Sequence, residues 1–380
     1  MSFRIGIDAH AIGSRQTGNE TYIKNLVNEL LKIESQHRFV LFFTHEEARE
    51  RWAGIQNEAR TQLLWPGHPL IRMPIVLPWK AKKEKLDLLH VQYAAPPFIK
   101  TPLITTIHDI SYEHHPEYFT RKEVMQFKAT IPRAARKAKR IFTVSEYSKR
   151  DIAETYNIDP AKIVVTYDGV GVDFKPVPES QRDATLQRYN IKQPYFLAVG
   201  NLQPRKNLAR LISAYDELRK ENPQVEHQLI IVGKKAWKYS PIFSEARSSC
   251  WSDAIIFTDY VPVADLAAIY SGATVFIYPT LFEGFGLPPL EAMACGTPVV
   301  TSNCSSLPEV VGEAAIKISP FDVSEIAQAI IELVDDHEKV NSLIRKGKEQ
   351  AAKFKWSDCA RKTLRTYEEV CEEEASSVLR

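Results

Sequence analysis

The chain has 380 residues, of which 44% are hydrophobic and 25% are charged, and its formal net charge is +2. This length favours two domains of ordinary size. The nearly balanced charge, without aromatic residues interleaved in basic runs, excludes a dedicated nucleic-acid binder. The five cysteines are odd in number and lack Cys-x-x-Cys spacing, which argues against a disulfide framework or a zinc site and favours a reducing compartment.

The sequence predicts neither a signal peptide nor a membrane span. Residues 3–8 form a first strand in this interpretation, and no run approaches the roughly eighteen apolar residues that cross a bilayer. We therefore expect a cytoplasmic protein.

In the first half, short apolar runs alternate with helical patterns, which is typical of a doubly wound α/β domain. The predicted strands are 4–8, 38–44, 86–91, 103–107, 140–144 and 163–167. The stretch 173–179 contains spaced prolines and no periodicity, which indicates a linker. The first domain is predicted to span residues 1–175.

The second half repeats this alternation. Its predicted strands are 195–199, 228–232, 254–257, 275–278, 298–301 and 315–318, with helices such as 207–221 and 263–270. This second domain would cover residues 176–355. The remaining segment, 356–380, carries a charged helical pattern with Trp356, Ala360, Leu364 and Tyr367 on one face, and we expect it to return to the first domain.

The most specific motif is a Gly-Phe-Gly turn bracketed by Glu283 and Glu291, with seven residues between the two glutamates. Pro288 and Pro289 favour a helix start, and the helix predicted over 290–295 places Glu291 in its first turn. The glycines of the turn let backbone amides approach an anion at the helix start. Because open α/β sheets bind ligands at the carboxyl ends of their strands, the motif predicts a sugar-nucleotide site.

A second motif opens the second domain, where Gly200 follows a strand and the cations Arg205 and Lys206 precede a helix. Arginine can bind two phosphate oxygens, lysine adds a compact charge, and the helix contributes its dipole. Alone, such a pair is equally well an ordinary solvated helix start. The neighbouring glutamate motif favours a diphosphate site.

Two further strand ends are candidates for the walls of a nucleobase pocket. Gly233 ends one predicted strand, and Tyr260 and Val261 lie in a turn after the next one. Either segment could instead be an ordinary turn.

Together these motifs resemble the retaining glycosyltransferases of family 4, which have the GT-B fold. The resemblance covers nearly the whole chain and rests on the loop 18–22 after the first strand and on the segments 107–109, 143–149, 200–207 and 283–300. It implies two doubly wound Rossmann-like domains that face a central cleft. The first would bind the acceptor, the second would bind the nucleotide sugar, and the carboxyl-terminal helix would cross back to the first.

The resemblance also implies roles for single residues. Arg205 and Lys206 would hold the donor phosphates, Glu291 the ribose hydroxyls and Glu283 the sugar hydroxyls, while the amides of 285–287 would meet the distal phosphate and the sugar. The expected donor site comprises Gly18, Asn19, Gly200, Arg205, Lys206, Gly233, Tyr260, Val261, Glu283, Phe285, Gly286, Leu287 and Glu291. The expected catalytic residues are His108, Glu283, Arg205 and Lys206.

His108 lies at a predicted strand end, in a segment that also contains Asp109, His114 and His115. The resemblance places His108 beside the donor sugar, and a histidine that merely caps the strand is the alternative. A metal site is disfavoured because adjacent histidines diverge, whereas zinc ligands converge from separated positions. No Asp-x-Asp pair follows a strand, so we expect neither a metal nor a cofactor, and the Arg-Lys pair would stabilise the leaving diphosphate.

The expected reaction is hexose transfer from a nucleotide sugar to a glycan or lipid-linked glycan in cell-surface polysaccharide synthesis. No residue is a convincing nucleophile of the kind that retaining hydrolases use, which favours front-face substitution with a donor phosphate oxygen as the base. UDP-glucose is the preferred donor, without a decisive residue, and GDP-mannose is the alternative. A GT-B sugar-nucleotide epimerase and a non-catalytic nucleotide- or glycan-binding module are the rival interpretations.

Two basic clusters in the first domain indicate a surface for peripheral contact with the inner face of the membrane. One flanks the apolar stretch 74–79 and comprises Arg72, Lys80, Lys82, Lys83 and Lys85; the other comprises Arg133, Arg136, Lys137, Lys139 and Arg140. A basic side chain near anionic lipid contributes about 1 kcal/mol, and an apolar edge with tryptophan can dock at the interface. A solvated helix face beside a core-directed loop is the alternative.

Overall fold

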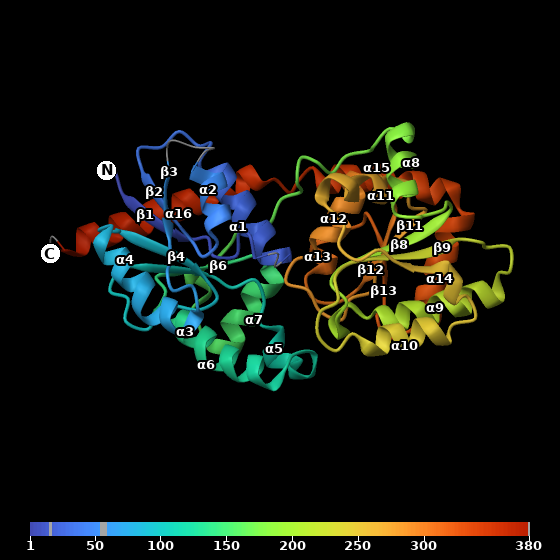
Figure 1. Ribbon diagram of the computed structural model, residues 1–380, viewed down its shortest axis with the longest axis horizontal. Coiled ribbons are helices and arrows are strands. Elements are labelled where there is room, and N and C mark those ends of the chain that lie inside the picture. Colours follow the sequence, from blue (N-terminus) through green and yellow to red (C-terminus); the bar gives the residue numbers. More distant parts are fainter. Residues whose placement is uncertain (15–16, 54–58, 379–380) are drawn as a thin grey trace. The chain divides into compact units, whose positions relative to one another are not determined.

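The computed structural model describes residues 1–14, 17–53 and 59–378. Contacts divide the chain into two units. The first comprises Met1–His114, Thr120–Gly169 and Lys355–Arg380, and the second comprises His115–Phe119 and Val170–Phe354. Each unit is built around one parallel sheet with helices packed on it, as Figure 1 shows.

The first unit contains a seven-stranded sheet in the order β3-β2-β1-β4-β5-β6-β7. Its strands are β1 Arg4–Asp8, β2 Arg38–Phe43, β3 Ala59–Leu63, β4 Leu88–Gln92, β5 Leu103–Thr106, β6 Arg140–Thr143 and β7 Ile163–Val165. Its helices are α1 Thr17–Leu30, α2 Glu46–Ala53, α3 Pro69–Ile71, α4 Leu77–Lys83, α5 Ser111–His114, α6 Arg121–Lys137, α7 Glu146–Tyr156 and α16 Trp356–Val378. Strand order runs outward from β1 to β3 and then resumes on the other side of β1 with β4. The direction of winding therefore reverses between β1 and β4.

The second unit contains a six-stranded sheet in the order β10-β9-β8-β11-β12-β13, which reverses between β8 and β11. Its strands are β8 Tyr195–Val199, β9 Gln228–Val232, β10 Ile255–Phe257, β11 Val275–Tyr278, β12 Val299–Ser302 and β13 Ile316–Ile318. Its helices are α8 Glu179–Arg188, α9 Leu208–Glu221, α10 Ser240–Ser248, α11 Val263–Gly272, α12 Leu287–Ala294, α13 Leu307–Val311, α14 Val323–Asp335 and α15 His337–Ala351. Helices α9, α10 and α14 pack together on one face of this sheet, with α8, α11, α12 and α15 on the other (Figure 1).

The predicted strands are confirmed to within two residues at each end, but the sequence missed β3. Inner strands of a parallel sheet are buried on both faces and therefore carry nearly continuous apolar runs, as in β8 and β11. Strand β3 has the sequence ARTQL, is only partly buried and pairs with β2 at the sheet edge. Its backbone pairing, rather than an apolar pattern, defines it as a strand.

Helix α16 packs against α1 in the first unit, as predicted for the carboxyl-terminal segment. A buried chain of hydrogen bonds fixes it to the sheet. Tyr367 Oη lies 2.6 Å from His90 Nδ1, His90 Nε2 lies 2.7 Å from Thr106 Oγ1, and Thr106 Oγ1 lies 3.0 Å from Tyr22 Oη. Burial lowers the pKa of His90 to about 3, so this ring is neutral at physiological pH.

The short segment His115–Phe119 belongs to the second unit although the chain on both sides of it belongs to the first. Trp237 donates its indole N–H to the carbonyl of Tyr118. Lys238 Nζ donates to the carbonyls of Glu117 and Phe119 at 2.6 and 3.1 Å. The loop after β9 therefore holds this segment through its backbone.

The apolar stretch 74–79 is helical, not a loop. It begins in a π-helical turn, Arg72–Val76, and continues into α4. The side chains of Leu70, Ile75 and Trp79 are 79, 62 and 55% exposed. Within residues 1–14, 17–53 and 59–378, no helix is long and apolar enough to cross a membrane.

In the structure, not every residue of the two basic clusters is an exposed, unneutralised cation as the sequence predicted. Arg72 is only 5% exposed and is therefore not part of the surface. In the second cluster, Lys139 and Arg140 form ion pairs with Glu374 and Glu373 of α16, which neutralise part of its positive charge.

Candidate active site

Two loops of the second unit meet at the carboxyl ends of β8 and β11. The first loop follows Gly200 and leads through a 3₁₀ turn, Pro204–Lys206, into α9, and the second runs from Pro279 to Gly286. They flank the point where the strand order reverses. In open α/β sheets, ligands bind in the crevice at such a point.

The structure brings Arg205, Lys206 and Glu283 together at this crevice. Lys206 Nζ donates to Glu283 Oε1 at 2.7 Å and to the hydroxyl of Tyr278 at 2.6 Å. Arg205 Nη1 lies 3.2 Å from Glu283 Oε2 and donates to the carbonyl of Phe282 at 2.9 Å. Among these three side chains, two cations thus share one carboxylate.

Neighbouring polar groups hold this arrangement in place. Asn207 adopts a left-handed conformation and donates through Nδ2 to the carbonyls of Pro279 and Pro320 at 2.9 and 2.7 Å. The hydroxyl of Ser305 accepts from the amide of Glu283 at 3.0 Å, and the hydroxyl of Ser306 donates to the carbonyl of Glu283 at 2.9 Å. Both loops are therefore anchored independently of any ligand.

Sequence reasoning missed Tyr278, Ser305 and Ser306, although each supports Glu283 or Lys206. Only their positions at strand ends could have indicated a role, because Tyr278 is the last residue of β11 and the two serines follow β12. Serine and tyrosine are too common at strand ends for that signal to identify them.

Helix α12 begins at Leu287, three residues earlier than predicted. Gly286 precedes it with φ of 110°, and a Cβ there would lie 2.7 Å from Leu307 Cδ2, so glycine suits this position. The two prolines occupy the first turn, where missing amide hydrogens cost no helical bonds. Glu291 is therefore in the second turn of the helix, which corrects the prediction of the first turn. Phe285 is buried, and its carbonyl accepts from the hydroxyl of Ser306 at 2.8 Å.

Glu291 accepts a hydrogen bond from the hydroxyl of Tyr270, with Oη to Oε2 at 3.0 Å. Burial raises the pKa of Glu291 to about 7, against the opposing effect of this hydrogen bond. Its carboxyl group therefore changes charge near neutral pH. An ionised Glu291 can accept hydrogen bonds from a pair of hydroxyls.

Gly200 and Gly233 lie against each other. A Cβ on Gly233 would lie 1.9 Å from the carbonyl oxygen of Gly200, so no side chain fits there. This contact gives Gly233 a packing role whether or not a nucleobase lies nearby.

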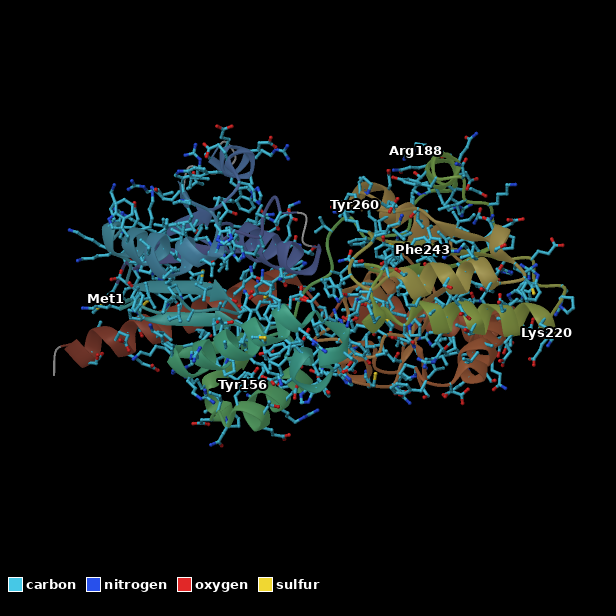
Figure 2. The ribbon with its side chains drawn as sticks, turned by 60° about the horizontal axis from the view of Figure 1, so that its bottom comes forward. Met1, Tyr156, Arg188, Lys220, Phe243 and Tyr260 are labelled. Atoms are coloured by element: carbon cyan, nitrogen blue, oxygen red, sulfur yellow. The ribbon has the colours of Figure 1, made fainter. Side chains whose placement is uncertain are left out.

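Tyr260 and Val261 differ in their surroundings. Val261 is 4% exposed, whereas Tyr260 is 53% exposed and is labelled in Figure 2. Lys234 Nζ lies 4.5 Å from the centroid of the Tyr260 ring. Of the two, only Tyr260 presents a ring on which a base could stack.

Gly18 and Asn19 belong to the first unit and lie in the first turn of α1, not in the predicted loop. Glu20 stabilises this first turn. Its Oε1 accepts from the amide of Gly13 at 2.8 Å, and its charge lies at the positive end of the helix.

His108 also belongs to the first unit and follows β5. Its Nε2 donates to Gln92 Oε1 at 3.2 Å, and the Tyr22 ring meets it edge-on with centroids 4.6 Å apart. Burial lowers the pKa of His108 to about 4, although Asp109 opposes the shift. The imidazole is thus a neutral hydrogen-bonding group near pH 7.

The neighbouring histidines have separate partners. His114 Nε2 lies 2.6 Å from Asp151 Oδ1, and His115 Nδ1 lies 3.2 Å from Glu117 Oε1. In the part of the chain that the structure describes, no three His, Cys, Asp or Glu side chains are grouped to hold a metal ion.

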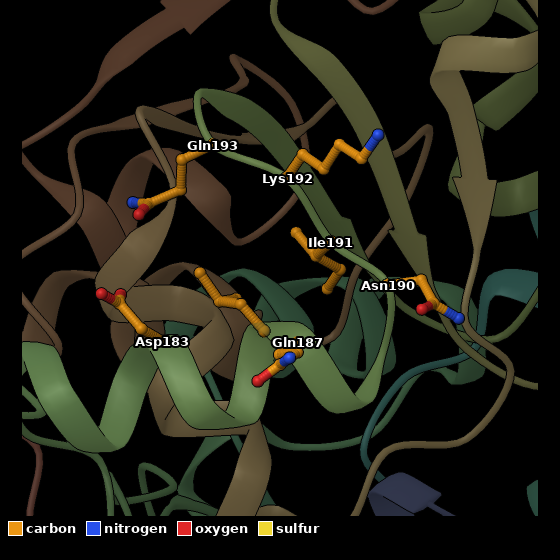
Figure 3. Close-up of a pocket in the computed structure, with 7 residues that line it drawn as sticks. Asp183, Gln187, Asn190, Ile191, Lys192 and Gln193 are labelled. Carbon is orange, nitrogen blue, oxygen red and sulfur yellow. The ribbon is translucent and has the colours of Figure 1, made fainter.

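A cavity of about 330 Å³ lies elsewhere on the second unit. Its walls are side chains of α8 and of the segment that follows it, as Figure 3 shows: Asp183, Leu186, Gln187, Asn190, Ile191, Lys192 and Gln193. None of the candidate donor-site residues is among them. Because residues 190–193 lead into the start of β8, this cavity lies near the amino end of that strand rather than at the carboxyl edge of the sheet.

Comparison with known proteins supports the same class of site. Residues 17–174 match the model of Glycosyltransferase Family 4, and residues 181–350 match that of Glycosyl transferases group 1. The chain is 36% identical over 265 residues to the O-antigen chain mannosyltransferase B of Escherichia coli, which covers 70% of this chain and 69% of that protein. It is 32% identical over 227 residues to the serotype-specific mannosyltransferase WbdA of Escherichia coli, covering 59% of this chain but only 28% of that protein.

Solved structures share the whole architecture. Sucrose-phosphate synthase from Thermosynechococcus elongatus aligns with a TM-score of 0.77 at 18% identity, over 97% of this chain and 99% of its own. Anabaena Alr3699/HepE, in complex with UDP and glucose, aligns with a TM-score of 0.77 at 16% identity, over 97% of this chain and 100% of its own. At such identities the likeness shows the fold alone. With the family models and the first relative, it establishes that the chain belongs to glycosyltransferase family 4 and has the GT-B fold.

Proposed function

We propose that the protein is a retaining mannosyltransferase that needs no metal ion and transfers mannose from GDP-mannose to a glycan or lipid-linked glycan acceptor during polysaccharide synthesis. The observation that carries this proposal is the group of Arg205, Lys206 and Glu283 at the reversal point of the second sheet. The names of the mannosyltransferase relatives favour the sugar.

The paired charges suggest how a donor would bind. Phosphate oxygens of the donor would compete with Glu283 for Arg205 and Lys206, which the carboxylate now occupies. Release from this ion pair would free the Glu283 carboxylate to accept hydrogen bonds from hydroxyls of the transferred sugar. Glu291 would bind the ribose hydroxyls, and the amides of 285–287 would meet the distal phosphate.

The cations would then serve the chemical step. As the bond between the anomeric carbon and the phosphate oxygen breaks, negative charge grows on the departing diphosphate. Arg205 and Lys206 are in place to stabilise that charge, which is the task a metal ion performs in other transferases. Neutral His108 would contribute a hydrogen bond to the sugar rather than a charge.

Retention would follow from front-face substitution. The acceptor hydroxyl attacks the anomeric carbon on the side that the diphosphate leaves, and its proton passes to a phosphate oxygen of the departing group. One carbon–oxygen bond breaks and another forms, with no bond to the protein. A sugar trapped covalently on a side chain of the unmodified enzyme would contradict this route.

GDP-mannose replaces UDP-glucose as the first candidate donor, because the relatives are named mannosyltransferases and no residue decides for UDP-glucose. The test incubates the protein with each donor and a methyl α-mannoside acceptor, in the presence of EDTA. We expect product from GDP-mannose only, with an α-linkage visible by NMR. Product from UDP-glucose alone, a β-linkage or complete loss of activity in EDTA would contradict the corresponding part of the proposal.

The same assay separates the rival functions. A transferase releases nucleotide in proportion to the acceptor present, whereas an epimerase alters or releases the sugar nucleotide without an acceptor. A non-catalytic binding module binds GDP and releases nothing. Nucleotide release measured with and without acceptor therefore identifies the class.

We further propose that the protein contacts the cytoplasmic leaflet of a membrane through α3, the π-helical turn and α4. Ile75 and Trp79 are 62 and 55% exposed, and Lys80 and Lys83 place their Nζ atoms 5.6 and 5.1 Å from the centroid of the Trp79 ring. Apolar side chains flanked by lysines suit an anionic interface.

In flotation with phosphatidylglycerol vesicles, Trp79→Ser should lower the bound fraction. Met125→Ser, at an exposed site on α6, is the control, and equal binding of the wild-type protein and Trp79→Ser would refute this contact.

A further inference from the structure

The segment that follows β12 holds the loop after β11 through its side chains. Ser302 Oγ donates to the carbonyl of Thr280 at 2.7 Å. Cys304 Sγ lies 3.6 and 3.5 Å from the carbonyl oxygens of Thr280 and Leu281. Polar side chains of the segment thus bind consecutive carbonyls of the loop, just before the loop reaches Glu283.

Ser305 fixes the amide side of Glu283. Its hydroxyl accepts from the amide of Glu283 at 3.0 Å and donates to the carbonyl of Cys304 at 2.7 Å. A serine hydroxyl has one proton, so the bond to Cys304 leaves the lone pairs of the oxygen for the amide. The backbone of Ser305 has a φ of 53°, in the left-handed region that non-glycine residues rarely adopt. Residues held in this region cluster at functional sites, which favours a functional role for this hydroxyl.

Ser306 fixes the carbonyl side of Glu283. Its hydroxyl is fully buried and lies 2.9 and 2.8 Å from the carbonyl oxygens of Glu283 and Phe285. In a planar trans peptide, the carbonyl and the amide hydrogen that follows it point in opposite directions. Because the carbonyl of Phe285 faces Ser306, the amide of Gly286 points away from Ser306.

Leu307 covers the same side of the Gly-Phe-Gly turn. A Cβ on Gly286 would lie 2.7 Å from Leu307 Cδ2, so the segment after β12 packs directly on the turn. Gly286 is also the residue that caps the start of α12, where the helix dipole favours an anion. The turn therefore presents this amide on the side opposite the serines.

We infer that Ser305 and Ser306 are positioning residues of the donor site. Ser305 sets the position of the Glu283 carboxylate, and Ser306 also aims the amide of Gly286 at the distal phosphate of the donor. Backbone groups occupy both hydroxyls, so the serines act through Glu283 and the turn rather than by touching the donor. This inference rests on the proposed glycosyl transfer and adds the residues that orient its donor site.

The test compares Ser305→Gly and Ser306→Ala with the wild-type protein, by calorimetric titration with GDP and with UDP and by steady-state transfer. Ser305→Gly removes the hydroxyl but suits the left-handed backbone, so its urea midpoint should stay close to the wild-type value. We expect its nucleotide affinity to stay within about 2-fold of wild type. Its kcat should fall about 10- to 100-fold, because a displacement of about 1 Å near the reacting groups has an effect of this size.

Ser306→Ala should lower both quantities. Its affinity for the nucleotide that the wild-type protein binds should fall about 10-fold, because the amide of Gly286 is no longer held towards a charged phosphate. Its kcat should fall at least as far as that of Ser305→Gly, since Glu283 also loses a contact. Ser306→Cys keeps a weak donor and should recover part of the nucleotide affinity. If Ser306→Ala does not fold, Ser306→Cys takes its place, and Ser305→Gly decides alone if neither folds.

Two matched substitutions in the second unit are the controls. Asn190→Gly puts glycine at another left-handed residue, with a φ of 54°, in the wall of the cavity beside α8. Ser271→Ala removes a hydroxyl that, like that of Ser305, accepts from an amide and donates to a carbonyl, those of Val177 and Ala267. Both variants should keep nucleotide affinity and kcat within about 2-fold of wild type.

The outcomes separate these positioning roles from the proposed transfer. Wild-type kcat in Ser305→Gly, wild-type nucleotide affinity in Ser306→Ala, or equal losses in the controls would overturn the roles. An equal fall of nucleotide affinity in Ser305→Gly and Ser306→Ala would also overturn them, because it indicates general damage to the loop. Binding of neither GDP nor UDP by the wild-type protein removes the donor site and the inference together. If the wild-type protein binds a nucleotide but transfers sugar from no donor, the proposed function fails, and a loss of affinity confined to Ser306→Ala still supports the positioning role.

Discussion

The two sheets share one winding scheme but present different charges at the point where it reverses. In the second sheet, Arg205 and Lys206 both pair with the carboxylate of Glu283. In the first sheet, Asp8 is the last residue of β1 and is buried; burial opposes its ionisation, but the electrostatic effects of His10 and Arg72 lower its pKa to about 2. Both sheets thus have a reversal point, whereas the side chains decide the charge there. Two cations beside one carboxylate suit a diphosphate.

The largest expected effect comes from removing a cation from the crevice of the second sheet. Lys206→Ala should lower kcat/KM about 100- to 1,000-fold, because the leaving diphosphate loses a preorganised positive charge. Steady-state transfer assays measure this effect. Lys220→Ala, at an exposed site at the end of α9 (Figure 2), should keep wild-type activity. A loss below about 5-fold in Lys206→Ala would show that the reaction does not depend on the charge of Lys206.

The second prediction distinguishes the role of the Glu283 carboxylate from the role of the two cations that pair with it. Glu283→Gln should lower transfer about 100-fold, because the sugar hydroxyls lose an ionised acceptor. The same change should leave GDP affinity equal or tighter, since Arg205 and Lys206 no longer compete for a carboxylate. Calorimetric titration with GDP measures the affinity. Weaker GDP binding in Glu283→Gln would mean that the carboxylate positions the cations rather than restraining them.

Two glycines give a comparison in stability. Gly233→Ala should destabilise the second unit by about 3 kcal/mol, because its Cβ would lie 1.9 Å from the Gly200 carbonyl oxygen. Gly18→Ala should instead stabilise the protein by about 0.5–1 kcal/mol, because it lies within α1 with no atom within 4 Å of the added carbon. Urea unfolding measures both changes. Equal stabilities of the two variants would contradict the close approach of the loops after β8 and β9.

The smallest effect is a difference in pH dependence between the carboxyl groups of the two units. The pKa of Glu291 is raised from 4.5 to about 7, so its contribution to the free energy of unfolding is full below pH 4.5 and is lost as the pH rises through 7. The pKa of Asp8 is lowered from 3.8 to about 2, so its contribution is present above pH 3.8 and is lost as the pH falls through 2.

The same titration should control nucleotide binding. If ionised Glu291 binds the ribose, GDP affinity should rise about 10-fold between pH 6 and 8, following the ionised fraction of a group with a pKa of about 7. Glu291→Gln should abolish this rise, and Asp8→Asn should retain it. An equal rise in wild-type protein and Glu291→Gln would assign it to the nucleotide instead.

The sequence predicted most of the fold because buried parallel strands carry uninterrupted apolar runs. Strand β3 was not predicted, because it lies at the edge of the sheet and contains the polar residues Arg60, Thr61 and Gln62. The helix over 287–294 was placed three residues late, because two consecutive prolines mark the start of a helix without fixing which turn they occupy. The local sequence pattern therefore predicted the existence of an element more accurately than the residues at which it begins and ends.

The candidate site was predictable where a motif concentrates it and unpredictable where it depends on tertiary contacts. The Arg-Lys pair and Glu283 were identified from sequence, and the structure places them within hydrogen-bonding distance. Arg72 was assigned to a membrane-facing surface because it stands among lysines, yet it is buried and its charge helps to lower the pKa of Asp8. Nothing in the local sequence distinguishes that arginine from its exposed neighbours.

The segment His115–Phe119 has a consequence for exchanging domains between relatives. Because Trp237 and Lys238 bind its backbone, the second unit is not one continuous stretch of sequence. A chimera joined only in the linker near 173–179 would pair these side chains with a foreign segment, and it would also separate α16 from its own α1. Recombination that preserves both units must therefore move 115–119 with 170–354 and leave 355–380 with the first unit.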